Sequence, residues 1–213
     1  IRIGTPICED AWHPGPTETF EESGAEILVV PNGSPYHRDK QDLRMTLMVS
    51  RVVESGLPLV YLNTIGGQDD QVFDGGSFVL NAGGGLAMSM PVFEEALEHV
   101  TYERQNGQLV CQGGPKADWP DAWEQDYAAM VGGLRDYLGK SGFSKVLLGL
   151  SGGVDSALVA VIASDALGPE NVRCVMLPSE YTSAHSLEDA EAVARALGCP
   201  YQSVPISVPR AAV

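Results

Sequence analysis

The sequence predicts an α/β protein with two units in series, and three observations support this fold class. In residues 1–98, short β-rich runs surround a helical pattern, which is typical of a layered α/β domain. From about residue 122, strands and helices alternate, which indicates a parallel sheet with right-handed crossovers. Residues 99–121 are polar and rich in Gly and Pro, which favours a strand-poor connector. We therefore expect domains at 1–98 and 122–213.

The first unit is predicted to contain strands on both sides of one helix. The strands are the β-rich runs bounded by turn residues, at 1–7, 27–31, 59–63 and 77–81. The helix runs from about residue 39 to 55, with Leu43, Leu47 and Val52 on one apolar side. The Gly-Leu-Pro at 56–58 ends it. Three glycines at 83–85 lie between two apolar runs, which suggests a hairpin turn.

The second unit is predicted to begin with a long amphipathic helix and then to alternate. The expected order is helix 123–140, strand 146–150, helix 155–167, strand 172–177 and helix 186–197. The chain begins inside a predicted strand and ends in a loop-like stretch, so we expect an internal piece of a longer protein.

Composition restricts the classes of partner. The net charge of −15 argues against nucleic acid, because phosphate binding relies on clusters of Lys and Arg. No apolar run approaches the roughly 20 residues of a membrane span, and no signal peptide is visible. The four cysteines are widely spaced without a CxxC pair, which argues against a zinc site or a disulfide framework. We therefore expect a cytoplasmic protein.

The most informative stretch is the turn between the strand at 146–150 and the following helix. Ser151-Gly152-Gly153 allows the backbone to approach a ligand closely, and the new helix offers unpaired N–H groups that suit a polyphosphate. Ser151 and Ser156 add hydroxyl donors. Asp155 would repel phosphates unless a divalent cation lay between them, so Mg²⁺ is implied. The plainer alternative is an ordinary helix start with Ser151 as its cap.

The turn lacks the G-x-x-x-x-G-K-[ST] pattern of a Walker A loop. It is similar instead to the PP-loop of the ATP pyrophosphatases, a family with a Rossmann-like parallel sheet. The resemblance implies that ATP is bound by Gly149, Leu150, Ser151, Gly152, Gly153, Val154, Asp155 and Ser156, with Mg²⁺ at Asp155. It also implies adenosine contacts from Met176 and Leu177, which the pattern alone assigns to the core. Segments 165–172, 176–179 and 181–183 resemble NAD⁺ synthetases in particular.

Near the beginning, the segment Cys8-Glu9-Asp10-Ala11-Trp12 places a cysteine just after an apolar run. A cysteine at the end of a strand can act as a nucleophile, although alone it is more often an inert buried thiol. The segment resembles the nucleophile turn of the nitrilase superfamily, which implies an α-β-β-α sandwich with Cys8 as nucleophile. The family's catalytic Glu and Lys precede the cysteine by more than seven residues, so they are not in this chain.

Two further segments extend this second resemblance. Segments 31–36 and 66–78 resemble the glutaminase domain that is attached to NAD⁺ synthetase. That resemblance implies that Ser34 and Lys40 hold glutamine. The residues alone leave open that Ser34 is a turn residue and Lys40 a solvated lysine at a helix start.

Together the resemblances imply a glutamine-dependent NAD⁺ synthetase, which amidates deamido-NAD⁺ with ammonia taken from glutamine. Its partners would be glutamine, ATP with Mg²⁺, and deamido-NAD⁺, and we expect a homo-oligomer. Two alternatives stay open: another amidotransferase with a PP-loop, or a nucleotide-binding fragment without full activity.

Overall fold

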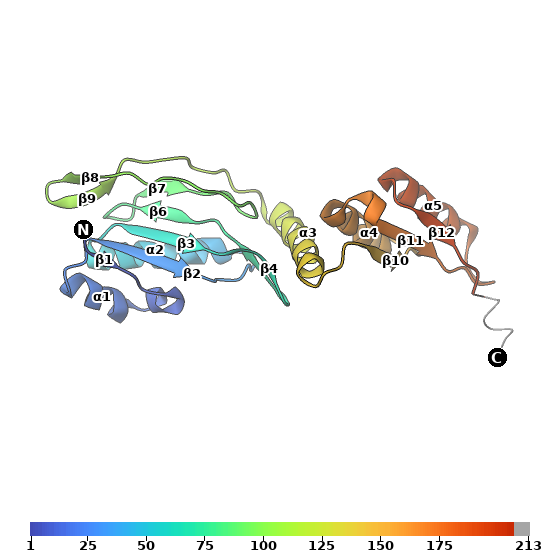
Figure 1. Cartoon of the computed structure of the whole chain (residues 1–213), viewed down its shortest axis with the longest axis horizontal. Coiled ribbons are helices and arrows are strands. Elements are labelled where there is room, and N and C mark those ends of the chain that lie inside the picture. Colours follow the sequence, from blue (N-terminus) through green and yellow to red (C-terminus); the bar gives the residue numbers. More distant parts are fainter. Residues whose placement is uncertain (207–213) are drawn as a thin grey trace. The chain divides into compact units, whose positions relative to one another are not determined.

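The computed structural model describes residues 1–206, and its contacts divide the chain into two compact units, Ile1–Ala129 and Met130–Val213. The border falls inside helix α3 (Ala122–Lys140), which is labelled in Figure 1. Among the described residues, no helix has the length and apolar character needed to cross a membrane.

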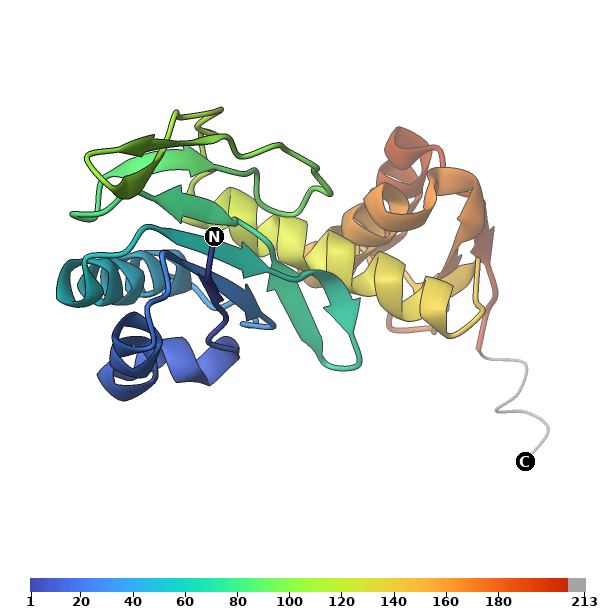
Figure 2. The same ribbon diagram turned by 60° about the vertical axis from the view of Figure 1, so that its left-hand side comes forward.

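The first unit is built on a five-stranded sheet of order β1-β2-β3-β6-β7. The first three strands are parallel, and β6 and β7 pair antiparallel to them and to each other. Their bounds are Ile3–Gly4, Ile27–Asn32, Leu59–Asn63, Phe78–Leu80 and Leu86–Ser89. Helices α1 (Pro14–Glu22) and α2 (Lys40–Ser55) lie on the same side of this sheet, as Figure 2 shows.

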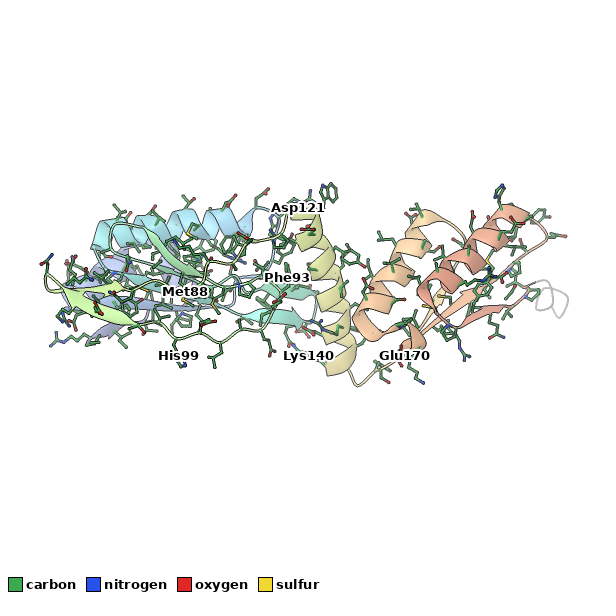
Figure 3. The ribbon with its side chains drawn as sticks, turned by 90° about the horizontal axis from the view of Figure 1, so that it is seen from above. Met88, Phe93, His99, Asp121, Lys140 and Glu170 are labelled. Carbon is green, nitrogen blue, oxygen red and sulfur yellow. The ribbon has the colours of Figure 1, made fainter. Side chains whose placement is uncertain are left out.

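Alternation along the strands separates two apolar clusters. Leu28, Val30, Leu59 and Tyr61 face the helices, where Met48 of α2 completes a fully buried core. The residues between them in sequence face the other way. There Val79, Ala87, Met88 and Cys111 form a second cluster, and Figure 3 labels Met88 on strand β7. Both faces of the sheet are therefore covered.

The connector contains a hairpin that the sequence analysis did not predict. Strands β8 (Tyr102–Gln105) and β9 (Gln108–Cys111) pair antiparallel around Asn106-Gly107. Both turn residues have positive φ, 50° and 87°, as a type I′ turn requires. The prediction of a strand-poor connector was wrong, because the Asn-Gly pair that we assigned to a loop is a strong hairpin signal.

Other differences in the first unit are local. The predicted strand at 1–7 is strand β1 only over Ile3–Gly4, and it leads into a 3-10 helix, η1 (Cys8–Trp12). Helix α1 was missed because Pro14-Gly15-Pro16 suggests a turn, although proline is tolerated at the first helical position. The hairpin of β4 (Ile65–Gln68) and β5 (Gln71–Asp74) was also missed. The predicted α2 and the glycine turn before β7 are confirmed.

The second unit is the parallel α/β arrangement that the sequence predicted. Its sheet has the order β10-β11-β12, with both pairs parallel, over Val146–Gly149, Val172–Met176 and Tyr201–Ser203. The connections are α4 (Val154–Leu167), followed by the short 3-10 helix η2 (Pro169–Asn171), and α5 (Ala184–Leu197). The core combines buried residues of the strands and both helices: Leu150, Ala160, Ala163, Val172, Cys174, Met176, Ala190 and Ala194.

Candidate functional site

Cys8 lies in a tight turn just after strand β1. It is partly exposed and has a φ of 52°, in a region that non-glycine residues seldom adopt. The turn is closed on both sides: the Ile7 N–H donates to Asp10 Oδ2 at 3.0 Å, and the Asp10 N–H donates to the Ile7 carbonyl at 3.1 Å. Backbone strain of this kind is concentrated at functional sites. A strained, accessible cysteine fits the nucleophile role better than the role of an inert buried thiol.

The structure brings Lys40 next to the cysteine turn. Lys40 is the first residue of α2, and its Nζ lies 4.7 Å from the centre of the Trp12 ring. Because Trp12 ends the 3-10 helix that Cys8 begins, the ammonium group is held close to that turn by a cation–π contact. This contact is more specific than a solvated lysine would make.

Ser34 is buried rather than a plain turn residue. Its Oγ accepts a hydrogen bond from Arg44 Nε at 3.1 Å, and its N–H donates to Asn63 Oδ1 at 2.9 Å. Asn63 Nδ2 donates in return to the Ser34 carbonyl at 3.2 Å and to the Gly75 carbonyl at 3.1 Å. The loop that carries Ser34 is thus fixed by side chains from α2 and β3.

The centre of this network is an ion pair that the sequence analysis missed. Arg44 Nη1 donates to Asp74 Oδ2 at 2.7 Å, and the two side chains are 0% and 1% exposed. The same guanidinium donates to the carbonyls of Ser34 and Pro35. We had taken Asp74 as part of an ordinary turn. An arginine held by so many partners inside a protein fixes geometry, because five donors are satisfied at once.

The sequence analysis missed Arg44 because the apolar periodicity suggested a different buried face for this helix. The predicted apolar side of this helix contained Leu43, which is 44% exposed, whereas the buried side contains Arg44, Met48, Arg51 and Val52. Two arginines on the buried side were the available signal, since arginine is seldom buried unless it is paired.

Tyr61 lies beneath the Ser34 loop and stacks on Phe78 with ring centres 4.8 Å apart. Burial raises the pKa of Tyr61 to about 12, and the positive charge of Arg44 partly opposes this rise. Ala11, in the turn that begins at Cys8, lies in the same buried cluster as Tyr61. The cysteine turn and the network of Ser34 and Arg44 are therefore built around one core.

The second site is the turn from β10 into α4. Gly153 has an extended backbone and occupies the cap position of the helix, which has no side-chain cap. Ser151 Oγ accepts from the Gly153 N–H at 3.3 Å, and Ser156 Oγ donates to the Gly153 carbonyl at 2.9 Å. The two hydroxyl groups thus stabilise the turn through hydrogen bonds to its own backbone. The first N–H groups of α4 lack partners within the helix, as at every helix start, and such groups can bind an anion.

Gly152 has a steric reason to be glycine. Its φ is 82°, and a Cβ at this position would lie 2.3 Å from the carbonyl oxygen of Ser186. No side chain fits there, so the turn packs directly on the first turn of α5. At Gly153 the nearest atom to an added Cβ is Ser151 Oγ at 3.5 Å, an ordinary contact.

A cavity of about 520 Å³ opens at the carboxyl ends of β10 and β11, where ligands bind in open α/β sheets. The predicted Gly149, Leu150, Ser151, Met176 and Leu177 line it. Met176 is buried, whereas Leu177 is 52% exposed, so only Met176 is a core residue as the pattern alone suggested. Five further lining residues were not among the predicted ATP contacts: Val175, Tyr181, Thr182, Ser183 and Ser186. The Ser183 side chain caps α5, a sequence signal that was available.

Asp155 is exposed in the first turn of α4. Within residues 1–206, no three His, Cys, Asp or Glu side chains gather to form a metal site. A cation at Asp155 would therefore take its other oxygen ligands from phosphates and water, which is the usual arrangement for Mg²⁺.

Comparison with known proteins also divides the chain into an N-terminal and a C-terminal part. The carbon-nitrogen hydrolase family model matches residues 1–113, and the NAD synthase model matches residues 126–213. The glutamine-dependent NAD(+) synthetase of Rhodobacter capsulatus is 58% identical over 213 residues, which are 100% of this chain and 39% of that protein. The Synechocystis sp. protein of the same name is 40% identical, over 97% of this chain and 39% of its own length.

A solved structure extends the likeness to three dimensions. The glutamine-dependent NAD⁺ synthetase from Acinetobacter baumannii, in complex with adenosine diphosphate, superposes with a TM-score of 0.92 at 37% identity. The match covers 99% of this chain and 40% of that one. The chain thus spans about two fifths of the length of the relatives it matches. It belongs to the carbon-nitrogen hydrolase family, continues into an NAD synthase domain, and resembles glutamine-dependent NAD⁺ synthetases throughout.

Proposed function

We propose that the chain is part of a glutamine-dependent NAD⁺ synthetase, with a glutaminase part at residues 1–98, a connector at 99–121 and a synthetase part at 122–213. One observation carries the proposal. The same chain holds a strained, accessible cysteine on a nitrilase-like sheet and a glycine turn at a nucleotide-sized cavity. An enzyme that moves ammonia from glutamine to an ATP-activated acid needs both.

In the glutaminase part, we infer that the Cys8 thiolate attacks the amide carbon of glutamine. Ammonia leaves, and water then cleaves the thioester to release glutamate and restore Cys8. Ser34 and Lys40 hold glutamine, and the Arg44–Asp74 pair keeps the Ser34 loop in position. The Glu9 N–H, next to the nucleophile, is suited to stabilise the oxyanion.

In the synthetase part, residues 149–156 hold the phosphates of ATP, and Met176 and Leu177 contact the adenosine. The carboxylate of deamido-NAD⁺ attacks the α-phosphorus, and pyrophosphate leaves. Ammonia then attacks the acyl carbon, and AMP leaves with formation of the amide. Asp155 would hold Mg²⁺, whose chemistry is to neutralise phosphate charge. Support comes from the steric fit of Gly152 and from the open N–H groups of α4.

The test is a comparison of two ammonia sources in a protein of the relatives' full length that contains this chain. We expect NAD⁺ formation from deamido-NAD⁺, ATP and Mg²⁺ with either glutamine or ammonium. Cys8→Ala should abolish the glutamine-driven rate and leave the ammonium-driven rate intact, whereas Gly152→Ala should abolish both. If Cys8→Ala still uses glutamine, the glutaminase assignment fails. If xanthylate replaces deamido-NAD⁺ as the better substrate, the chain belongs to another amidotransferase.

The bulk properties suit a cytoplasmic enzyme with small-molecule substrates, because a net charge of −15 disfavours nucleic acid. We also propose a homo-oligomer, which light scattering on the full-length protein would test.

A further inference from the structure

The loop at residues 33–39, which carries Ser34, is held at two ends by different parts of the chain. At its inner end, Asn63 and Arg44 fix Ser34 itself. At its outer end, the Tyr36 N–H donates to the Val72 carbonyl at 2.7 Å, and the Tyr36 ring meets Phe93 edge to face at 5.4 Å. Figure 3 labels Phe93, and it also labels Asp121 just before α3.

Two side chains at the outer end, those of Tyr36 and Arg38, also contact α3. The Tyr36 hydroxyl donates to Asp126 Oδ1 at 2.7 Å, and Arg38 Nη2 donates to Asp126 Oδ2. The Arg38 guanidinium also lies over the Trp123 ring, 4.6 Å from its centre. The Asp126 carboxylate thus accepts hydrogen bonds from two side chains of the loop at residues 33–39, one at each oxygen.

Charge and burial keep these bonds intact at neutral pH. The hydrogen bond from Arg38, followed by that from Tyr36, lowers the pKa of Asp126, so its carboxylate is ionised. Burial, followed by the hydrogen bond to Asp126, raises the pKa of Tyr36 to about 12, so its hydroxyl keeps the proton that it donates.

A cavity of about 200 Å³, bordered by Tyr36, Arg38 and Gln125 among others, lies beside the contact. The contacts with Asp126 and Trp123 connect the outer end of the loop to α3 next to this space.

Asp126 is also where the match to the NAD synthase family begins. Helix α3 continues from there to Lys140, and its Leu134 packs against the core of the second unit. The residue that receives the loop at residues 33–39 therefore belongs to the first compact unit, and its helix runs on into the second.

We propose that Asp126 is a positioning residue for the glutaminase reaction: it sets the Ser34 loop through Tyr36 and Arg38, so that the beginning of helix α3 contributes to glutamine binding. This inference depends on the proposed function. Asp126 does not touch the reacting atoms in this role. It lowers the cost of ordering the loop, and its loss weakens glutamine binding without changing the chemistry at Cys8.

The test uses the full-length protein and separates KM from kcat. Asp126→Ala and Tyr36→Phe should each raise the KM for glutamine by about five- to tenfold, the scale of one typical intramolecular hydrogen bond. The ammonium-driven rate and the melting temperature should stay near those of the unsubstituted protein. The double variant should be little worse than Asp126→Ala alone, because both changes break one contact. Asp126→Glu, which keeps the carboxylate, should recover part of the affinity.

The matched control is Glu124→Gln, which removes a negative charge from the same turn of α3 and keeps an acceptor for the Asp121 N–H. Its glutamine KM should be unchanged. Three outcomes would overturn the inference: a glutamine KM within twofold of the original in Asp126→Ala, an equal rise in Glu124→Gln, or an equal loss of the ammonium-driven rate. Failure of the proposed function would be recognised separately, because the unsubstituted protein would then form no NAD⁺.

Discussion

The two candidate sites of this chain are built in opposite ways. The cysteine site depends on a buried network whose members, Ser34, Arg44, Asn63 and Asp74, come from separate elements. The nucleotide turn is local: residues 149–156 follow one another, and outside contact comes mainly from the backbone of Ser186. The first site is therefore held by a buried ion pair between distant residues, and the second by glycine backbone conformation and hydrogen bonds within the turn.

Because the sites are built differently, substitutions should disrupt them for different reasons. A buried ion pair that loses one partner leaves an uncompensated charge, which destabilises the whole fold around it. A glycine turn that gains a side chain is disturbed locally, and ligand binding suffers first. Each prediction below tests one side of this contrast.

The largest effect is expected from Arg44→Met. It leaves Asp74, which is 1% exposed, without its cation, and we expect the free energy of unfolding of the first unit to fall by about 3–5 kcal/mol. Urea denaturation of this chain would measure the change. The matched control is Arg104→Met in the same unit, which breaks a more exposed pair with Glu26 and should be nearly neutral. A similar small change in both variants would show that the buried network does not hold the site.

A smaller and more local effect is expected from Gly152→Ala. The new Cβ must displace the Ser186 backbone and accept a φ of 82°, which together should cost about 2–3 kcal/mol and abolish stabilisation by ATP and Mg²⁺. Gly153→Ala is the control, since its φ of −88° and its space accept a methyl group. Thermal unfolding with and without nucleotide would compare them. If Gly152→Ala keeps the full nucleotide-induced shift, the turn does not bind the phosphates.

The same contrast explains what the sequence could predict. The turn at 149–156 is a run of neighbouring residues at a strand-to-helix junction, so its structure follows from local rules for glycine and helix starts. The parallel sheet around it was predicted for the same reason, because each strand and helix has its own periodicity. The predicted strands and helices of the second unit are all present.

The cysteine site could be predicted only in part, because its geometry depends on contacts between distant residues. Cys8, Ser34 and Lys40 were found by resemblance, whereas Arg44 and Asp74 were not found. The residues next to Asp74 in the sequence do not indicate whether it is an ordinary turn residue or forms a buried ion pair with Arg44, which is 30 residues away. On α2, the competing apolar residues Leu43 and Val53 suggested the wrong face, and packing against the sheet selected the face with Arg44.

The smallest effect is expected from Tyr61→Phe, which changes one atom beneath the Ser34 loop. Phenylalanine keeps the stacking on Phe78, and the Tyr61 hydroxyl makes at most one weak polar contact, with Ser34, so stability at pH 7 should change by about 1 kcal/mol or less. The effect should appear at high pH. The folded state raises the pKa of Tyr61 from 10.0 to about 12, so the stabilisation is present below pH 10 and is lost as the pH rises to 12.

In Tyr61→Phe, the free energy of unfolding should therefore decrease less between pH 10 and 12 than in the unsubstituted protein. Urea midpoints measured across that range would show the difference. Part of the decrease will remain, because burial also raises the pKa of Cys174, to about 11. Tyr181→Phe controls for the loss of a hydroxyl at a position that is 82% exposed. An equally reduced decrease in the two variants would contradict the assignment to Tyr61. A selective effect would show that ionisation of Tyr61 destabilises the buried site, a constraint that an open glycine turn does not share.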